Sequence, residues 1–288
     1  MKNQLKTVLL LGGLSAILIG IGSALGPTYL YGFTALAVLL NFGAYFFSDR
    51  IVLAMHHAHE VPRAEAPVLH QMVEDLARKA GIPKPRVFII PEAQPNAFAT
   101  GRNPEHGVVA VTEGIVDLLT ERELKGVIAH ELAHIENRDI LVATVAAGIA
   151  AAVTYIAHAA QLVAIFGGRS DDEGERPSFL GSILLVMVAP IAATLIQLGI
   201  SRSREYLADE TGARLTGDPE GLARALEKME QAVHRIPGRV EPATASLFIV
   251  SPLSGGRSLL SMFSTHPPLE ERIQRLRGLR RSLVGVPA

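Results

Sequence analysis

Hydrophobic positions gather in four long apolar runs, at residues 8–25, 29–47, 140–166 and 179–200. A Gly26-Pro27 break alone separates the first two, and the first has no convincing A-x-A cleavage site. They therefore predict two membrane helices joined by a tight turn rather than a signal peptide. As helices, the last two would reach about 40 Å and about 33 Å, enough to cross the hydrocarbon layer. The many small residues of the third run also suit a helix buried against protein.

The apolar runs divide the chain into four parts. We expect two N-terminal transmembrane helices in residues 1–50 and a membrane hairpin in residues 140–200. The remaining parts, 51–139 and 201–288, are expected to be the two halves of one soluble domain. Basic residues lie near the helix ends on the side of these halves, namely Arg50, Arg63, Arg202 and Arg204. By the positive-inside rule, the domain faces the cytoplasm from a multi-pass position in the cell membrane.

Shorter periodicities within the two halves predict a mostly helical α+β fold with a small β-sheet. Gly81 and Pro83 close an amphipathic helix, and Pro and Gly residues break up three short strands. The predicted helices are 64–80, 121–139, 203–215 and 219–233, with a last basic helix after His266-Pro267-Pro268, and the predicted strands are 86–90, 96–100 and 108–112.

His130, Glu131 and His134 form an H-E-x-x-H motif inside the predicted helix 121–139, which starts with a capping-box pattern at Thr120. Four residues advance a helix by slightly more than one turn, so the two histidines share one face and can bind one metal ion. Glu131 is offset by about 100° and can reach a water molecule beside that ion. This is the spacing with which zinc peptidases build their site. Two solvated histidines on a surface helix would produce the same pattern.

A catalytic zinc needs three protein ligands, so a third must come from another element. The best candidate is Glu205, and Asp209 follows on the same helix face. That pair supplies one carboxylate for zinc and one to accept the free N–H of a ligand histidine, which fixes its tautomer. The alternative is a solvated charged face, in which Arg202 and Arg204 pair with these carboxylates.

The composition narrows the class of protein. Of 288 residues, 49% are hydrophobic and 19% are charged, an apolar excess that indicates a bilayer. The chain has no cysteine, so a metal site must use His, Asp or Glu. Its net charge of −1 gives no reason to expect nucleic acid as a partner.

Taken together, these motifs resemble the HtpX-type heat-shock membrane metalloproteases, relatives of the endopeptidases that cleave prenylated CAAX proteins. The resemblance covers nearly the whole chain and also uses the segments 96–101, 204–209 and 265–268. It implies a gluzincin pattern with one Zn²⁺ per chain and Glu205 as the third ligand. It also implies an endopeptidase that degrades misfolded or damaged membrane proteins. One departure is the segment 56–60, His-His-Ala-His-Glu, which raises the possibility of an accessory metal.

The residues suggest how such a site would work. Glu131 would take a proton from the attacking water and pass it to the leaving amine. His266 is a candidate donor to the oxyanion, although it is equally compatible with an ordinary loop histidine, and Tyr206 is a weaker candidate. Residues 96–100 could form an edge strand that binds substrate as an added strand through Asn96, Ala97, Phe98 and Ala99, or a plain core strand.

Three other functions remain open from the sequence. An intramembrane protease would need H-E-x-x-H well inside an apolar run, whereas charged residues surround the motif here. A catalytically inactive scaffold or adaptor would not need Glu131. A transporter would account for the four apolar runs but not for a zinc site. His56, His57 and His59 are most simply polar residues at the membrane surface.

Overall fold

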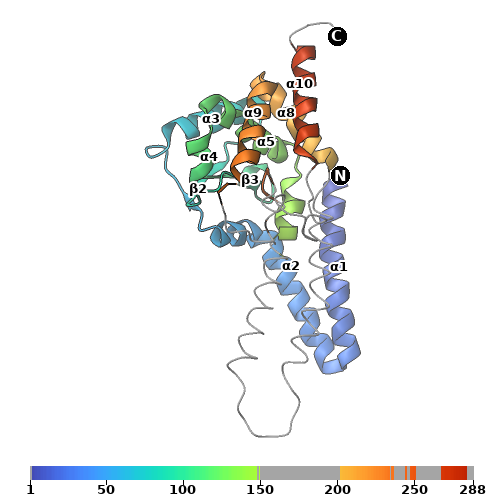
Figure 1. Ribbon diagram of the computed structural model, residues 1–288. Coiled ribbons are helices and arrows are strands. Elements are labelled where there is room, and N and C mark those ends of the chain that lie inside the picture. Colours follow the sequence, from blue (N-terminus) through green and yellow to red (C-terminus); the bar gives the residue numbers. More distant parts are fainter. Residues whose placement is uncertain are drawn as a thin grey trace.

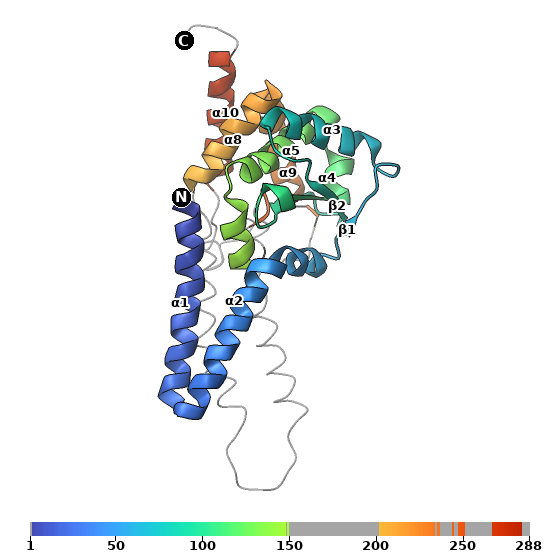
Figure 2. The same cartoon turned by 180° about the vertical axis from the view of Figure 1, so that it is seen from behind.

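A computed structural model describes residues 2–147, 149, 202–233, 235–236, 244, 247–250 and 267–283. A long helical hairpin extends from a mixed domain in which helices surround a small sheet (Figures 1 and 2). The helices are α1 (Lys2–Leu25), α2 (Pro27–Met55), α3 (Pro67–Ala80), α4 (Glu113–Leu118), α5 (Glu121–Glu136), α8 (Arg202–Thr216), α9 (Pro219–Val233) and α10 (Leu269–Leu283), with a 3₁₀ turn at Pro104–His106. The strands are β1 (His59–Glu60), β2 (Arg86–Ile90), β3 (Ala97–Thr100) and β4 (Val108–Thr112).

The hairpin of α1 and α2 turns at Gly26, whose φ of 119° is accessible to glycine but strained for other residues. Pro27 starts α2, where its missing N–H would have no helical partner. Asn41 donates to Ser15 Oγ at 2.6 Å and fastens the two helices together. Among the described residues, α2 is the one helix long and apolar enough to cross a bilayer, and α1 carries a shorter apolar stretch, Thr7–Gly20. The helix predicted to end at residue 47 continues to Met55.

The sheet has the order β1-β2-β4-β3. Strands β2 and β4 are parallel, whereas β1 and β3 join antiparallel. Strand β3 therefore lies at an edge of the sheet, and it begins at Ala97, one residue after the predicted start. Strand β1, a two-residue strand at His59–Glu60, was not predicted.

Each face of the sheet packs against a different part of the molecule, because side chains alternate along a strand. Val87, Val109 and Val111 face the main core, which is built from α3, α5 and α9. The opposite face presents Phe88 and other apolar residues to Val52 and Leu53, near the end of α2. The end of the long apolar helix is thus part of a core cluster of the domain.

The start of α5 is fixed by the predicted capping box. Thr120 accepts from the Glu123 N–H, and the Glu123 carboxylate accepts in return from the Thr120 N–H at 2.9 Å. Lys228 of α9 also donates to Glu123, at 2.7 Å. These contacts connect the first turn of α5 to α9.

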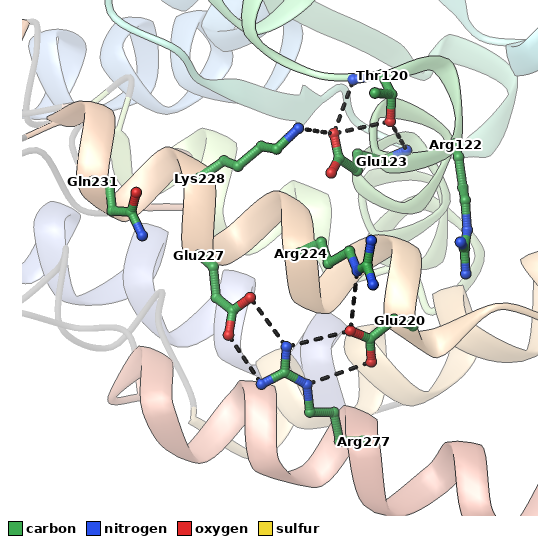
Figure 3. Close-up of a pocket in the computed structure, with 9 residues that line it drawn as sticks. All are labelled: Thr120, Arg122, Glu123, Glu220, Arg224, Glu227, Lys228, Gln231 and Arg277. Atoms are coloured by element: carbon green, nitrogen blue, oxygen red, sulfur yellow. Dashed lines mark hydrogen bonds and ion pairs between the residues drawn. The ribbon is translucent and has the colours of Figure 1, made fainter.

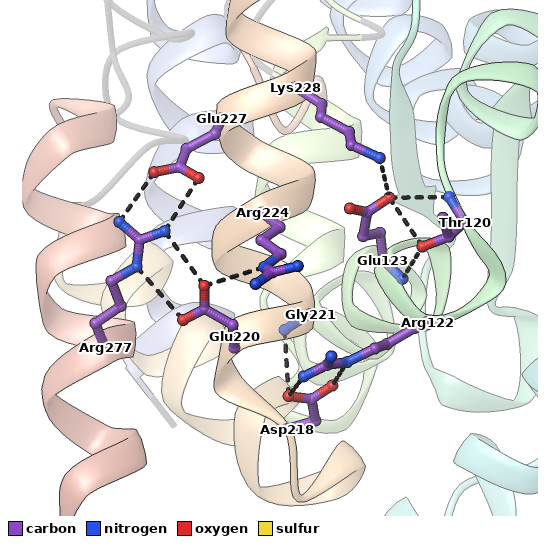
Figure 4. A network of polar contacts seen from close by, with 10 residues as sticks. All are labelled: Thr120, Arg122, Glu123, Asp218, Glu220, Gly221, Arg224, Glu227, Lys228 and Arg277. Carbon is purple, nitrogen blue, oxygen red and sulfur yellow. Dashed lines mark hydrogen bonds and ion pairs between the residues drawn. The ribbon is translucent and has the colours of Figure 1, made fainter.

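A polar pocket of about 670 Å³ lies between the start of α5, α9 and α10 (Figure 3). Its charges form a network rather than an unpaired patch (Figure 4). Arg277 of α10 contacts Glu220 at 3.3 Å and Glu227 at 3.0 Å, both on α9. Arg122 of α5 pairs with Asp218 just before α9. The network helps to hold α10 on α9 and α9 on α5, and so contributes to the position of the C-terminal helix.

Candidate metal centre

The H-E-x-x-H residues lie on the part of α5 that faces the core. Val127, Ile128 and Leu132 are fully buried and seat the helix in the main cluster. His130 and Glu131 are themselves only 1% and 2% exposed. The motif is therefore rigidly held, which excludes the alternative of two solvated histidines on a surface helix.

Helix α8 brings the predicted third ligand to this helix, across a gap in sequence of about seventy residues. Close approach is possible because Gly212 faces α5, where a Cβ atom would lie 2.9 Å from the His130 backbone nitrogen. Glu205 Oε1 lies 3.7 Å from His134 Nε2, and Glu205 Oε2 lies 3.7 Å from His130 Nε2. The donor atoms of the three side chains all lie within 4.8 Å of one another.

Each histidine has a carboxylate on its other ring nitrogen. His130 Nδ1 lies 2.9 Å from Asp209 Oδ1, an ion-pair contact, as predicted for Asp209. His134 Nδ1 lies 3.1 Å from Asp139 Oδ1, a contact that was not predicted. The prediction of one helix over 121–139 is wrong at its end: α5 stops at Glu136, and Arg138 turns the chain with a φ of 55°. That turn returns Asp139 to His134.

The donor set fits zinc. Carboxylates at both Nδ1 atoms favour a proton there, so each imidazole would bind a metal through Nε2 once that nitrogen carries no proton. The Nε2 atoms of His130 and His134 are 3.2 Å apart. Tetrahedral zinc with Zn–N distances of about 2.0–2.1 Å holds two nitrogens about 3.3 Å apart. Two imidazoles and one carboxylate are also the ligands of a catalytic rather than a structural zinc.

The accessory metal considered for residues 56–60 finds no support. Within the described residues, the triad is the one group of three or more metal-binding side chains in reach of one ion. His56 is buried, and its Nε2 lies 2.8 Å from Thr244 Oγ1. His57 and His59 are exposed.

An arginine that the sequence analysis did not single out lies beside the centre. Arg272 of α10 is 0% exposed and binds both Asp209 oxygens at 2.8 Å. Arg202 and Arg204 are not the partners of Asp209. Burial works to raise the pKa of Asp209, but the adjacent Arg272 guanidinium outweighs it and lowers that pKa. Asp209 is therefore kept ionised where it contacts His130.

The titratable groups of the centre are strongly perturbed. Burial lowers the pKa of His130 and raises the pKa of Glu131 to about 8. Burial also works to lower the pKa of His134, but the negative charge of Asp139, Glu205 and Glu131 raises it to about 10. Such clustering of shifted groups is typical of catalytic sites.

Strand β3 reaches the centre from the sheet. The backbone N–H of Ala99 hydrogen bonds to the Glu131 carboxylate. The Ala97 carbonyl accepts from the Ile249 N–H at 3.3 Å, and the Asn96 side chain donates to the Val250 carbonyl at 3.2 Å. Residues 247–250 therefore lie along the start of this edge strand, whose four residues are all buried.

Two predicted oxyanion donors remain to be placed. His266 lies outside the described residues. Tyr206 is described, and its ring lies 3.7 Å from the Arg275 guanidinium of α10. Its hydroxyl also hydrogen bonds to Glu271 of the same helix. Tyr206 is thus engaged by α10 rather than by the metal ligands.

Comparison with known proteins agrees with this geometry. Residues 63–280 match the model of peptidase family M48. The chain belongs to this family. The M48 match spans strands β2, β3 and β4, helix α5 and helix α8, which supplies Glu205 and Asp209, and so includes the whole described centre.

Several known proteins match this chain over nearly its full length. A protease HtpX homolog of Syntrophobacter fumaroxidans is 53% identical and covers 97% of this chain and 100% of its own. One from Aquifex aeolicus is 52% identical over 93% of this chain and 90% of its own. S. mikatae Ste24p shares the fold, with a TM-score of 0.50 and 21% identity. The alignment covers 95% of this chain but 64% of that longer protein.

Several predictions are thereby confirmed. The chain is a membrane zinc metalloendopeptidase of the M48 family, with a mostly helical α+β fold and a His-His-Glu zinc triad. Its substrates are proteins. Asp139 and Arg272 are the residues that sequence reasoning missed. A signal existed for Arg272, since it shares a helix face with the buried Leu276, four residues later.

Proposed function

We propose that this peptidase cleaves internal peptide bonds of misfolded or damaged membrane proteins at the cytoplasmic face of the cell membrane. The observation that carries the proposal is the place of Glu131. Its buried carboxylate lies between the zinc triad and an edge strand, in contact with the Ala99 N–H. A general base between a metal site and a strand suited to bind an extended peptide is the arrangement that peptide hydrolysis requires.

We assign the roles as follows. His130, His134 and Glu205 hold zinc, and Asp209 orients His130. When bound, zinc supplies Lewis-acid chemistry, which makes water more acidic and polarises the scissile carbonyl. Glu131 accepts the proton of the attacking water and then protonates the leaving amine. Burial raises the pKa of Glu131 to about 8, and the positive charge of a bound metal ion would act in the opposite direction and favour the carboxylate that accepts the proton. His266 stays a prediction as the donor to the oxyanion.

Substrate binding is assigned to residues 96–99. Backbone pairing with an edge strand requires little side-chain identity, so it suits an enzyme that acts on many unfolded sequences. Buried small residues at Ala97 and Ala99 allow another backbone to approach closely. An extended substrate would displace or extend the contact that Ile249 makes with Ala97.

The helical hairpin supports an assignment of the side of the membrane that the domain faces. The N-terminus and the end of α2 both lie beside the domain, while the turn at Gly26 lies at the far end (Figure 1). Lys2, Lys6 and Arg50 are therefore on the domain side, which the positive-inside rule assigns to the cytoplasm. The third and fourth runs, predicted to form a membrane hairpin in residues 140–200, lie outside the described residues except for a helical start at 140–147 and 149.

The function is tested with Glu131→Gln, which keeps the size of the side chain and removes its basicity. We expect the full-length variant to retain zinc and to lose cleavage of casein and of an unfolded membrane protein. Zinc content measured on the same sample separates loss of the base from loss of the metal. Proteolysis at the wild-type rate would overturn the role of Glu131, and a wild-type protein without bound zinc would overturn the proposal as a whole.

The orientation of the domain in the membrane can be tested by cysteine labelling. The chain has no cysteine, so each introduced thiol is the one reactive thiol in its variant. Thr28→Cys places a thiol near the hairpin turn, and Arg214→Cys places one on the exposed surface of α8. We expect an impermeant maleimide to label Thr28→Cys in intact cells and Arg214→Cys only in permeabilised cells. The reverse pattern would put the peptidase domain on the other side of the membrane.

A further inference from the structure

Arg272 is the largest fully buried side chain among the described residues. It lies in the first turn of α10, on the same face as the buried Ile273 and Leu276. An apolar residue would be the ordinary choice at such a position, because an unpaired buried cation is strongly destabilising. The guanidinium must therefore be compensated by its contacts.

These contacts join three parts of the active site. Nε and Nη2 bind the two carboxylate oxygens of Asp209, each at 2.8 Å. Nη1 donates to the carbonyl of Ile249 at 3.0 Å. Nη2 also lies 3.5 Å from His130 Nε2, and Nη1 lies 4.0 Å from Glu205 Oε2. One buried cation thus contacts the partner of a zinc ligand and the segment alongside strand β3.

The bidentate pairing has a geometric consequence. A guanidinium that donates two parallel hydrogen bonds fixes the plane of a carboxylate, which a single donor cannot do. Asp209 in turn lies 2.9 Å from His130 Nδ1, so its orientation controls the orientation of the imidazole. The same guanidinium holds Ile249, whose N–H bonds to the Ala97 carbonyl of β3.

We propose that Arg272 is a positioning residue that orients the imidazole of His130 through Asp209. Through Ile249, it also holds residues 247–250 in place beside the substrate-binding strand β3. Its effect on zinc passes through Asp209, whereas its effect on substrate passes through the backbone of residues 247–250. The inference rests on the zinc role of the His130–His134–Glu205 triad. It also predicts that removing Arg272 affects zinc binding and KM together.

The matched control comes from the same helix. Arg277, five residues further on, pairs with Glu220 and Glu227 on α9 and is 44% exposed in its side chain (Figure 4). Arg277→Met removes a cation and weakens the attachment of α10 without touching the centre. If Arg272 only held α10 in place, both variants would change the enzyme in the same way.

The experiment compares full-length wild type, Arg272→Met, Arg272→Lys and Arg277→Met in detergent. Zinc affinity is measured by competition with a chelator, and kcat and KM are measured on a peptide substrate. We expect Arg272→Met to lower zinc affinity about 10–100-fold and to raise KM at saturating zinc. Arg272→Lys should recover part of the zinc affinity, because it keeps the charge but not the bidentate geometry. Arg277→Met should match wild type in zinc affinity and KM.

A double variant tests the route through Asp209. Asp209→Asn with Arg272→Met should bind zinc no more weakly than Asp209→Asn alone, because residues that act in series are not additive. Should Arg272→Met fail to fold, Arg272→Lys combined with Asp209→Asn provides the same comparison. Wild-type zinc affinity in Arg272→Met, equal losses in Arg277→Met, or losses that multiply in the double variant would each overturn the proposal. A wild-type protein that binds no zinc would instead refute the role of the triad.

Discussion

Gly212 offers a sharp test of how the zinc triad is assembled. It lies where α8 crosses α5, and a Cβ atom there would be 2.9 Å from the His130 nitrogen. The same atom would be 3.1 Å from the carbonyl carbon of Ala129. Both are backbone atoms of a buried helix and cannot rotate away. Non-bonded carbon atoms are normally about 3.5–4.0 Å apart, so Gly212→Ala should push α8 outward by roughly 0.5 Å.

That movement acts directly on the centre, because α8 carries Glu205 and Asp209. Overpacking of a core typically costs about 1–3 kcal/mol, and we expect a loss of that size in the free energy of unfolding. Catalytic groups must be held to about 0.5 Å, and a 1 Å error can cost about 100-fold in rate. We therefore expect Gly212→Ala to lower zinc affinity and to reduce kcat/KM by about 10–100-fold.

Two other glycines separate these effects. At Gly126, a Cβ atom would lie 2.6 Å from the Leu222 nitrogen, so Gly126→Ala strains the contact of α5 with α9 instead. Gly126→Ala should lose about as much stability as Gly212→Ala but retain most of its zinc affinity. At Gly278 of α10, nothing lies within 4 Å of the added atom. Gly278→Ala should be neutral or stabilising by up to about 1 kcal/mol, because alanine favours a helix.

The assay uses the full-length protein in one detergent. Thermal unfolding measures stability, chelator competition measures zinc affinity, and casein digestion at saturating zinc gives the rate. The reasoning would be refuted if Gly212→Ala bound zinc and cleaved casein as wild type does. It would also be refuted if Gly126→Ala lost as much zinc affinity as Gly212→Ala.

Three further predictions concern α5 and its surroundings. Asp139→Ala should lower zinc affinity about 10–100-fold by releasing His134 Nδ1, as measured by chelator competition, and an unchanged affinity would remove Asp139 from the site. Because the pKa of His134 is raised to about 10 before a metal binds, zinc must displace its proton. Zinc affinity should therefore rise about tenfold per pH unit between pH 7 and 9, with proton release seen by calorimetry in buffers of different ionisation enthalpy, and a flat profile would contradict this. Thr120→Ala should cost about 1 kcal/mol of stability in thermal unfolding by removing the cap of α5, with zinc affinity unchanged. A matching loss of zinc affinity would mean that the start of α5 controls the centre.

Local sequence patterns predicted the parts of the structure that depend on interactions between residues close together in the chain. Strands β2 and β4 and helix α9 have the predicted bounds, since each is a short periodic segment enclosed by Pro or Gly. The capping box at Thr120 formed as its residue spacing required. His130 and His134 share a face because helix geometry alone puts them there. Glu205 could be proposed because zinc chemistry requires a third ligand.

Contacts between distant segments could not be predicted in the same way. Asp139 reaches His134 because α5 ends at Glu136 and Arg138 takes a left-handed conformation, which a helical pattern does not reveal. Arg272 is one of several arginines in a basic helix, and its burial depends on how α10 packs on α8 and α9. The contact of Ile249 with β3 joins segments more than 150 residues apart in sequence.

The sequence by itself determined the chemistry of this protein: two histidines one turn apart, a glutamate beside them, a carboxylate pair downstream and apolar runs suited to a membrane. Helical periodicity and ligand preference act over a few residues, so they can be read directly from the chain. Only the tertiary structure decided which carboxylate faces each imidazole, which arginine is buried among them and which strand borders the site. Those choices depend on close packing of backbones, as at Gly212, and packing has no signature within a single segment.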